Sequence, residues 1–147
     1  MRYLLTAKNL SKRYIQTHGF FSRKKTIIKA LDDVSLNIKK GKTLAVVGES
    51  GSGKSTLARS LIRLVSIDKG TIIIDGNDFL NLNSTALKNM RKNIQMIFQD
   101  PYASLNPRMK IQSIMEEPLL IHKAGTKSSN QKKIEVMIKR VGLHLSD

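Results

Sequence analysis

The residues best suited to chemistry lie in one glycine-rich loop, Gly48-Glu49-Ser50-Gly51-Ser52-Gly53-Lys54-Ser55-Thr56. This run matches the phosphate-binding pattern G-x-x-x-x-G-K-[ST] in full. Glycines let the backbone turn so that successive N–H groups point inward at phosphate oxygens, and a helix beginning near Lys54 adds its positive N-terminal end. We expect Lys54 to reach the β- and γ-phosphates of a nucleotide, and the Ser55 hydroxyl to supply one ligand to Mg²⁺.

The sequence on either side of the loop supplies the elements that must position it. Residues 43–47 form an almost wholly apolar run, which predicts a strand buried on both faces, as in a parallel sheet. Behind the loop, apolar residues recur at helical spacing from Leu57 to Val65. A Gly/Ser-rich turn before a surface helix is the alternative reading, and the combination of strand, full motif and helix argues against it.

The remaining N-terminal half reads as antiparallel structure. Residues 3–10 predict a short strand followed by a turn over residues 11–14, and residues 17–29 a surface loop or hairpin excursion. Alternating apolar positions from Leu31 to Ile38 predict a half-buried strand that ends in a turn. Residues 71–76 predict a strand running into an Asp-Gly hairpin turn.

The C-terminal half predicts further short elements. Residues 84–90 predict a short helix with Ser84 as N-cap, and residues 94–98 a strand. A helix is expected after Pro107, which Pro118 would end or kink. Residues 125–130 look like a polar linker, and residues 131–143 predict a last helix. Together these elements indicate an α/β fold.

Composition narrows the class of protein. The 147 residues suit one domain, and the absence of cysteine excludes a disulfide framework or a Cys-based zinc site. The 26 Lys and Arg exceed the 11 Asp and Glu, giving +15, but the excess is spread along the chain, so we expect no direct nucleic-acid partner. No signal peptide and no apolar run of about 20 residues is present, which predicts a cytoplasmic chain.

A second cluster narrows the kind of nucleotide-binding protein. The run Gln95-Met96-Ile97-Phe98-Gln99-Asp100-Pro101-Tyr102-Ala103-Ser104-Leu105-Asn106-Pro107-Arg108-Met109 resembles the Q-loop region of ATP-binding cassette (ABC) ATPases, in particular the ATP-binding subunits of dipeptide and oligopeptide importers. The loop at 48–56 and the run Glu116-Glu117-Pro118-Leu119-Leu120 are similar to the same subfamily. The resemblance covers nearly the whole chain, from about Leu4 to Leu143.

The resemblance implies roles for further residues. It places Tyr14 where these ATPases stack an aromatic ring on adenine, although an ordinary half-buried turn residue is the alternative. It implies that Gln99 contacts Mg²⁺ and the attacking water, whereas without the family Gln99 is a polar residue at a strand end. The stretch from Asp100 to roughly Leu120 would face the membrane permease, or its apolar residues are plain helical core.

Three parts of such an ATPase are not found in the sequence: the L-S-G-G-Q-type signature, the Walker B strand and the switch histidine. Ile72-Ile73-Ile74-Asp75 imitates a Walker B strand, but Gly76 follows, and we expect Asp75 in a hairpin of the antiparallel β subdomain. The chain is therefore expected to be the N-terminal part of one ABC ATP-binding domain (residues 1–147), with a P-loop NTPase core, the Q-loop near residue 99 and the start of the helical subdomain at about 108–147, truncated before the signature.

These implications define an expected function. The resemblance implies an ATP-binding subunit that uses ATP and Mg²⁺ to drive import of di- or oligopeptides. Its implied partners are membrane permease subunits and a second ATP-binding subunit in a head-to-tail dimer at the cytoplasmic face of the membrane. We expect this chain alone to bind ATP weakly and hydrolyse little or none, and to be marginally stable or aggregation-prone. Alternatives are a nickel-importer subunit, a binding-only or non-functional fragment, and, behind these, a basic nucleic-acid-binding module.

Overall fold

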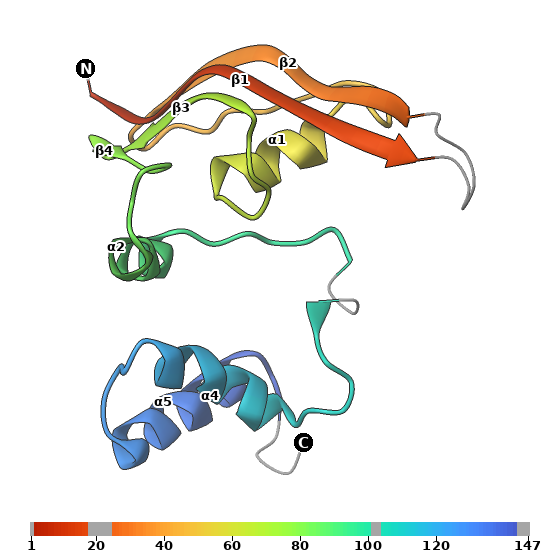
Figure 1. Ribbon diagram of the computed structural model, residues 1–147. Helices are drawn as coiled ribbons and strands as arrows, with labels where there is room; N and C mark the ends of the chain where they lie inside the picture. Colours follow the sequence, from red (N-terminus) through yellow and green to blue (C-terminus); the bar gives the residue numbers. More distant parts are fainter. Residues whose placement is uncertain (1, 18–24, 101–103, 144–147) are drawn as a thin grey trace. The chain divides into compact units, whose positions relative to one another are not determined.

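The computed structural model describes residues 2–17, 25–100 and 104–143. The chain divides into two compact units, Met1–Ser84 and Thr85–Asp147, here called the N-terminal and C-terminal units. Figure 1 shows the elements of both, and each unit is described by itself.

The N-terminal unit is built on a four-stranded antiparallel sheet in the order β2-β1-β3-β4. Strand β1 (Tyr3–Thr17) pairs with β2 (Lys25–Lys39) over nearly its whole length, and its other side pairs with β3 (Lys69–Ile74). β3 turns into β4 (Asn77–Asp78). Both central residues of that turn have positive φ, 48° at Asp75 and 81° at Gly76, as a type I′ hairpin turn requires. The predicted Asp-Gly hairpin is confirmed.

Strand β1 is longer than its sequence predicts. No turn forms at residues 11–14, because β1 continues through Thr17 and stays paired with β2. The pairing absorbs register shifts between Ala7 and Leu10, Leu10 and Lys12, and Lys12 and Arg13. A surface loop or hairpin excursion was expected at residues 17–29. Thr17 is the last residue of β1, and residues 25–29 belong to β2. Residues 18–24 lie outside the described residues.

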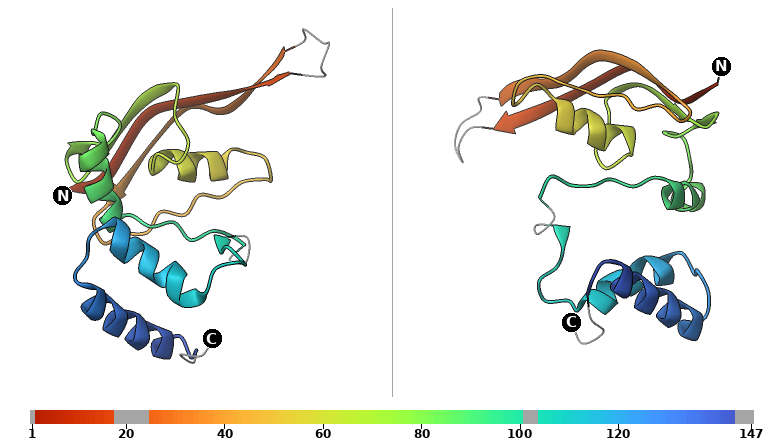
Figure 2. Two further views of the ribbon diagram at one scale, coloured as in Figure 1. Left: turned by 60° about the horizontal axis from the view of Figure 1, so that its bottom comes forward. Right: turned by 180° about the vertical axis from the view of Figure 1, so that it is seen from behind.

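Helix α1 (Lys54–Leu61) covers one face of this sheet, as Figures 1 and 2 show. It buries Leu57 and Ser60 against the sheet side. Burial of apolar side chains supplies the main driving force for such packing. The buried hydrophobic residues of the unit are Ala7, Leu10, Leu31, Leu57, Ile72, Ile74 and Phe79.

Two predicted strands, at residues 43–47 and 94–98, are not formed. Val47 is 91% exposed, so the run at 43–47, which was expected to be buried on both faces, is open to solvent. In the run at 94–98, Ile97 is 97% exposed. A parallel strand needs neighbouring strands for its hydrogen bonds and helices for its faces. Within the described ranges neither segment has such a neighbour, so both runs stay extended and unpaired.

The C-terminal unit contains the helices after the sheet. α2 (Ser84–Met90) begins at the boundary and has the predicted bounds, with Ser84 as its first helical residue and not its cap; a 3-10 turn, Arg91–Asn93, follows it. α4 (Ile111–Ile121) and α5 (Lys127–Arg140) contact each other and lie side by side in every view (Figures 1 and 2). In the described part of the chain, no helix combines the length and hydropathy that crossing a bilayer requires.

Two expectations for these helices need correction. Of the two outcomes expected at Pro118, an end or a kink, the first is wrong, because α4 continues to Ile121 with the proline inside it. The linker expected at 125–130 is mostly helix, because α5 begins at Lys127. The Thr126 hydroxyl accepts the Ser129 N–H (3.3 Å) and so caps this polar first turn.

Candidate functional site

The glycine-rich loop closes around the side chain of its own lysine. Lys54 Nζ donates to the carbonyl oxygens of Gly48 (2.7 Å) and Glu49 (2.5 Å) and to Ser52 Oγ (3.3 Å). The Ser52 N–H donates to the same Glu49 carbonyl at 3.3 Å. The loop therefore curls so that one ammonium group holds its two ends together.

The loop ends in the first turn of α1. Gly53 occupies the N-cap position with φ 92°, and no side chain caps the helix. The first intrahelical bond runs from the Leu57 N–H to the Gly53 carbonyl (2.8 Å), so the amides of Lys54, Ser55 and Thr56 precede it. No acidic residue lies in this turn, and the helix end keeps the positive potential that attracts an anion.

Strand β2 fixes where the loop ends. A Cβ atom on Gly53 would collide with the backbone carbonyl oxygen of Ala30 and would lie 3.7 Å from Leu31 Cδ2. Glycine is required here both by its left-handed backbone and by this close approach. The packing of α1 on β2 thus sets the position of the loop relative to the sheet.

Tyr14 lies on the same hairpin as this contact. Its side chain is 40% exposed and it pairs with Ile28 of β2. Lys12, two residues earlier, pairs with Leu31. Leu31 follows Ala30, the residue that Gly53 packs against. The hairpin that the end of the loop packs against therefore also carries Tyr14, the aromatic residue expected to stack on the base.

Gln99 belongs to the C-terminal unit. It is exposed and lies at a bend after the unpaired run at residues 94–98, so its expected contacts with Mg²⁺ and water stay predictions. Residues 101–103 of the Q-loop-like run lie outside the described residues.

Asp75 takes the structural role that its context predicts. It lies in the β3–β4 turn and forms an ion pair with Arg2 (3.2 Å), with both side chains largely exposed. This position in an antiparallel hairpin is not that of a catalytic carboxylate after a buried parallel strand.

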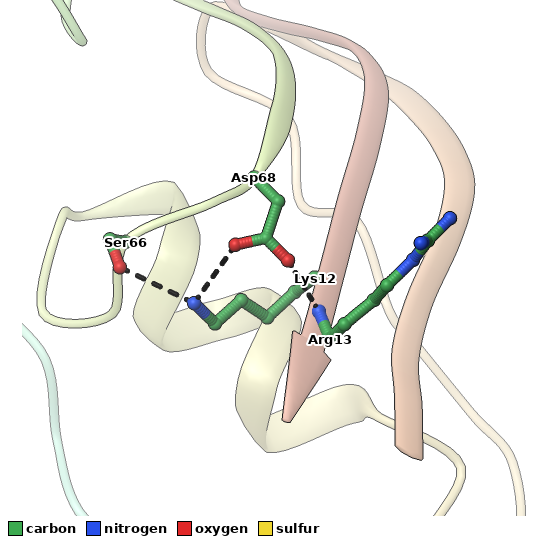
Figure 3. A network of polar contacts seen from close by, with 4 residues as sticks. All are labelled: Lys12, Arg13, Ser66 and Asp68. Atoms are coloured by element: carbon green, nitrogen blue, oxygen red, sulfur yellow. Dashed lines mark hydrogen bonds and ion pairs between the residues drawn. The ribbon is translucent and has the colours of Figure 1, made fainter. Parts of the chain in front are cut away.

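Sequence reasoning missed a polar network beside Tyr14 (Figure 3). Lys12 Nζ donates to Asp68 Oδ1 (3.2 Å) and to Ser66 Oγ (3.3 Å), and the Arg13 N–H donates to Asp68 Oδ2 (2.7 Å). The Arg13 amide, followed by Lys12, holds the pKa of Asp68 below its usual 3.8. No sequence pattern indicated this network, because residues 11–14 were expected to form a turn and nothing linked Lys12 to a carboxylate so far along the chain.

Several known proteins are similar in sequence to this chain. A family model described as ABC transporter matches residues 31–147. The oligopeptide transport ATP-binding protein AppF of Bacillus subtilis is 46% identical over 97% of this chain, which covers 44% of AppF. The dipeptide transport ATP-binding protein DppF of Haemophilus influenzae is 47% identical over 95% of the chain, which covers 42% of DppF. The chain thus spans less than half the length of these relatives.

A solved structure has a similar fold. The ATP-binding cassette MJ0796, in a dimeric post-hydrolysis state bound to ADP and Pi, superposes with a TM-score of 0.72 at 28% identity. The match covers 97% of this chain and 59% of that one. The predicted fold class, a truncated α/β P-loop core with an antiparallel β subdomain, is confirmed.

Proposed function

Since the chain belongs to the ABC transporter family, we propose that its N-terminal unit binds the phosphates of ATP at residues 48–56 and its base at Tyr14. The observation that carries this proposal is the closure of the loop around Lys54 Nζ at the N-terminal end of α1, which no side chain caps. A cation and free backbone amides converging on one loop form a site for a polyphosphate.

The residues present fit a magnesium ion beside that polyphosphate. Ser55 is exposed in the first turn of α1 and offers a hydroxyl; the role of Gln99 as a second ligand is proposed from the family resemblance alone. Hard oxygen donors of this kind, with phosphate oxygens and water, suit Mg²⁺. When bound, the ion neutralises the charge of the phosphates. Lys54 orients them, and the amides at the start of α1 hold them.

The wider role belongs to the whole subunit, of which this chain is the N-terminal part. That subunit hydrolyses ATP at the cytoplasmic face of the membrane, in a head-to-tail pair of ATP-binding subunits docked on permease subunits, and so drives import of di- or oligopeptides. Support for this cargo comes from the relatives, which are named as oligopeptide and dipeptide transport proteins. This chain alone hydrolyses little or no ATP, because phosphoryl transfer depends on fully positioned groups.

Nucleotide titration tests the site. The anisotropy of a fluorescent ATP analogue with Mg²⁺ should rise saturably with the protein and be reversed by ATP. Lys54→Ala should weaken binding by about ten-fold or more, because a hydrogen bond to a charged group is worth about 1.5–3 kcal/mol. The matched control is Lys8→Ala, which removes the same charge from an exposed position of β1 outside the loop. Equal affinities for the two variants would refute the assignment.

Uptake measurements test the cargo. Cells in which the gene is deleted should lose import of a labelled dipeptide or oligopeptide and keep import of nickel. Loss of nickel uptake with intact peptide uptake would contradict the proposed cargo.

A further inference from the structure

Lys12 lies at the centre of a small network next to the ring of Tyr14. Its ammonium contacts Ser66 Oγ and Asp68 Oδ1 and lies 5.5 Å from the centroid of the Tyr14 ring. The Lys12 side chain is only 12% exposed, which is low for a lysine. Its polar partners fix the ammonium over one face of the ring (Figure 3 shows these partners).

Asp68 ties this stretch of β1 to the segment that enters β3. The regular pairing of β1 with β3 ends at Ser11 and Lys69. Beyond it, the Asp68 N–H donates to the Ser11 carbonyl (2.8 Å), and the Asp68 carboxylate accepts the Arg13 N–H (2.7 Å). The backbone immediately before Tyr14 is therefore held on the side of β1 away from β2, beyond the point where the described pairing with β3 ends.

A cation over an aromatic ring is attracted by the negative face of the ring. Because Lys12 lies over one face of Tyr14, a base that stacks on this ring would use the opposite face. The partially exposed Tyr14 ring is held by two kinds of constraint, the backbone anchor at Arg13 and the cation above it. A rigid platform loses less entropy when a base stacks on it.

We propose that Lys12, held by Ser66 and Asp68, is a positioning residue that fixes the ring of Tyr14 so that its opposite face stacks on the base of ATP. This inference rests on the proposed function. It makes the network part of base binding, while Lys54 and the loop bind the phosphates independently of it.

The test compares MgATP with magnesium tripolyphosphate, which has the phosphates without the base, using the full chain. The measured quantity is the ratio of the two dissociation constants, tripolyphosphate over ATP. Lys12→Met, which keeps the length of the side chain without its charge, should lower this ratio about two- to five-fold. Tyr14→Ala should lower it about ten-fold, and Lys12→Arg, which retains a cation, should restore most of it.

The ratio separates positioning from stability. A smaller folded fraction weakens both ligands by the same factor, so it leaves the ratio unchanged. If Lys12→Met does not fold, Asp68→Asn removes the charge that holds Lys12 and should lower the ratio in the same direction. An unchanged ratio in either folded variant, with Lys54→Ala still deficient, overturns this inference alone. Absence of saturable MgATP binding by the unaltered chain overturns the proposed function as well.

Discussion

Replacing Gly53 by alanine tests the contact that positions the glycine-rich loop. Gly53 has φ 92° and approaches the Ala30 carbonyl so closely that a Cβ atom cannot fit. Gly51, in the same loop, also has a positive φ of 81°, but a Cβ atom there would have no neighbour within 4 Å. Gly51→Ala is therefore a matched control that adds the same atom and the same backbone strain without the collision.

The two substitutions should differ by the energy of the collision. A left-handed conformation costs an L-residue about 1–2 kcal/mol, and the lower chain entropy of unfolded alanine offsets part of this, leaving about 1 kcal/mol for Gly51→Ala. Overpacking in a fixed surrounding adds about 1–3 kcal/mol. The total for Gly53→Ala is then about 3 kcal/mol, because α1 or β2 must move to admit the new atom.

Urea unfolding followed by circular dichroism measures this difference. With a slope of about 2 kcal/mol per molar urea, the midpoint of Gly53→Ala should lie about 1 M below that of Gly51→Ala. Gly53→Ala should also lose affinity for MgATP, since the first turn of α1 moves with the loop. Equal midpoints for the two variants would show that the approach to Ala30 does not hold the loop, and would refute the reasoning.

Two further predictions concern the network and the exposed runs. The folded-state pKa of Asp68 lies below 3.8, so its contribution to stability is fully present above that pH and is lost as the pH falls through the folded-state value. The difference in unfolding free energy between the unaltered chain and Asp68→Asn should therefore shrink in acid. A difference that grows in acid would contradict the role of Asp68 as an anchor. Val47 and Ile97 are 91% and 97% exposed, so the double substitution Val47→Thr, Ile97→Thr should change stability by less than about 0.5 kcal/mol and reduce self-association measured by light scattering; unchanged association would show that these runs are not its cause.

Local chemistry made the start of α1 and the β3–β4 turn predictable. The spacing of Gly48, Gly53 and Lys54 specified the loop and the start of α1, and Asp75-Gly76 specified the β3–β4 turn. Each of these features depends on residues close together in the sequence. The motif predicts them because backbone conformation and side-chain reach are fixed over a few residues.

The errors have causes at longer range. Residues 43–47 and 94–98 have the composition of buried strands, but burial depends on partners that a local pattern does not contain. Lys12 and Arg13 looked like turn residues, yet Asp68 accepts the Arg13 N–H and β1 continues. The start of α5 was missed although Thr126 offered a cap, because the first turn that it caps is polar and resembles a linker.

The three hydrogen bonds of Lys54 also bear on the entropy of ligand binding. Ordering a lysine side chain costs about 2 kcal/mol of rotamer entropy, and contacts with Gly48, Glu49 and Ser52 impose that order within the loop itself. The rotamer entropy of Lys54 is therefore lost when the loop folds, before any phosphate binds. Phosphate binding as proposed at this loop would exchange the acceptors around an ammonium group that is already ordered. The enthalpy of binding should then reflect that exchange more than the ordering of a free side chain.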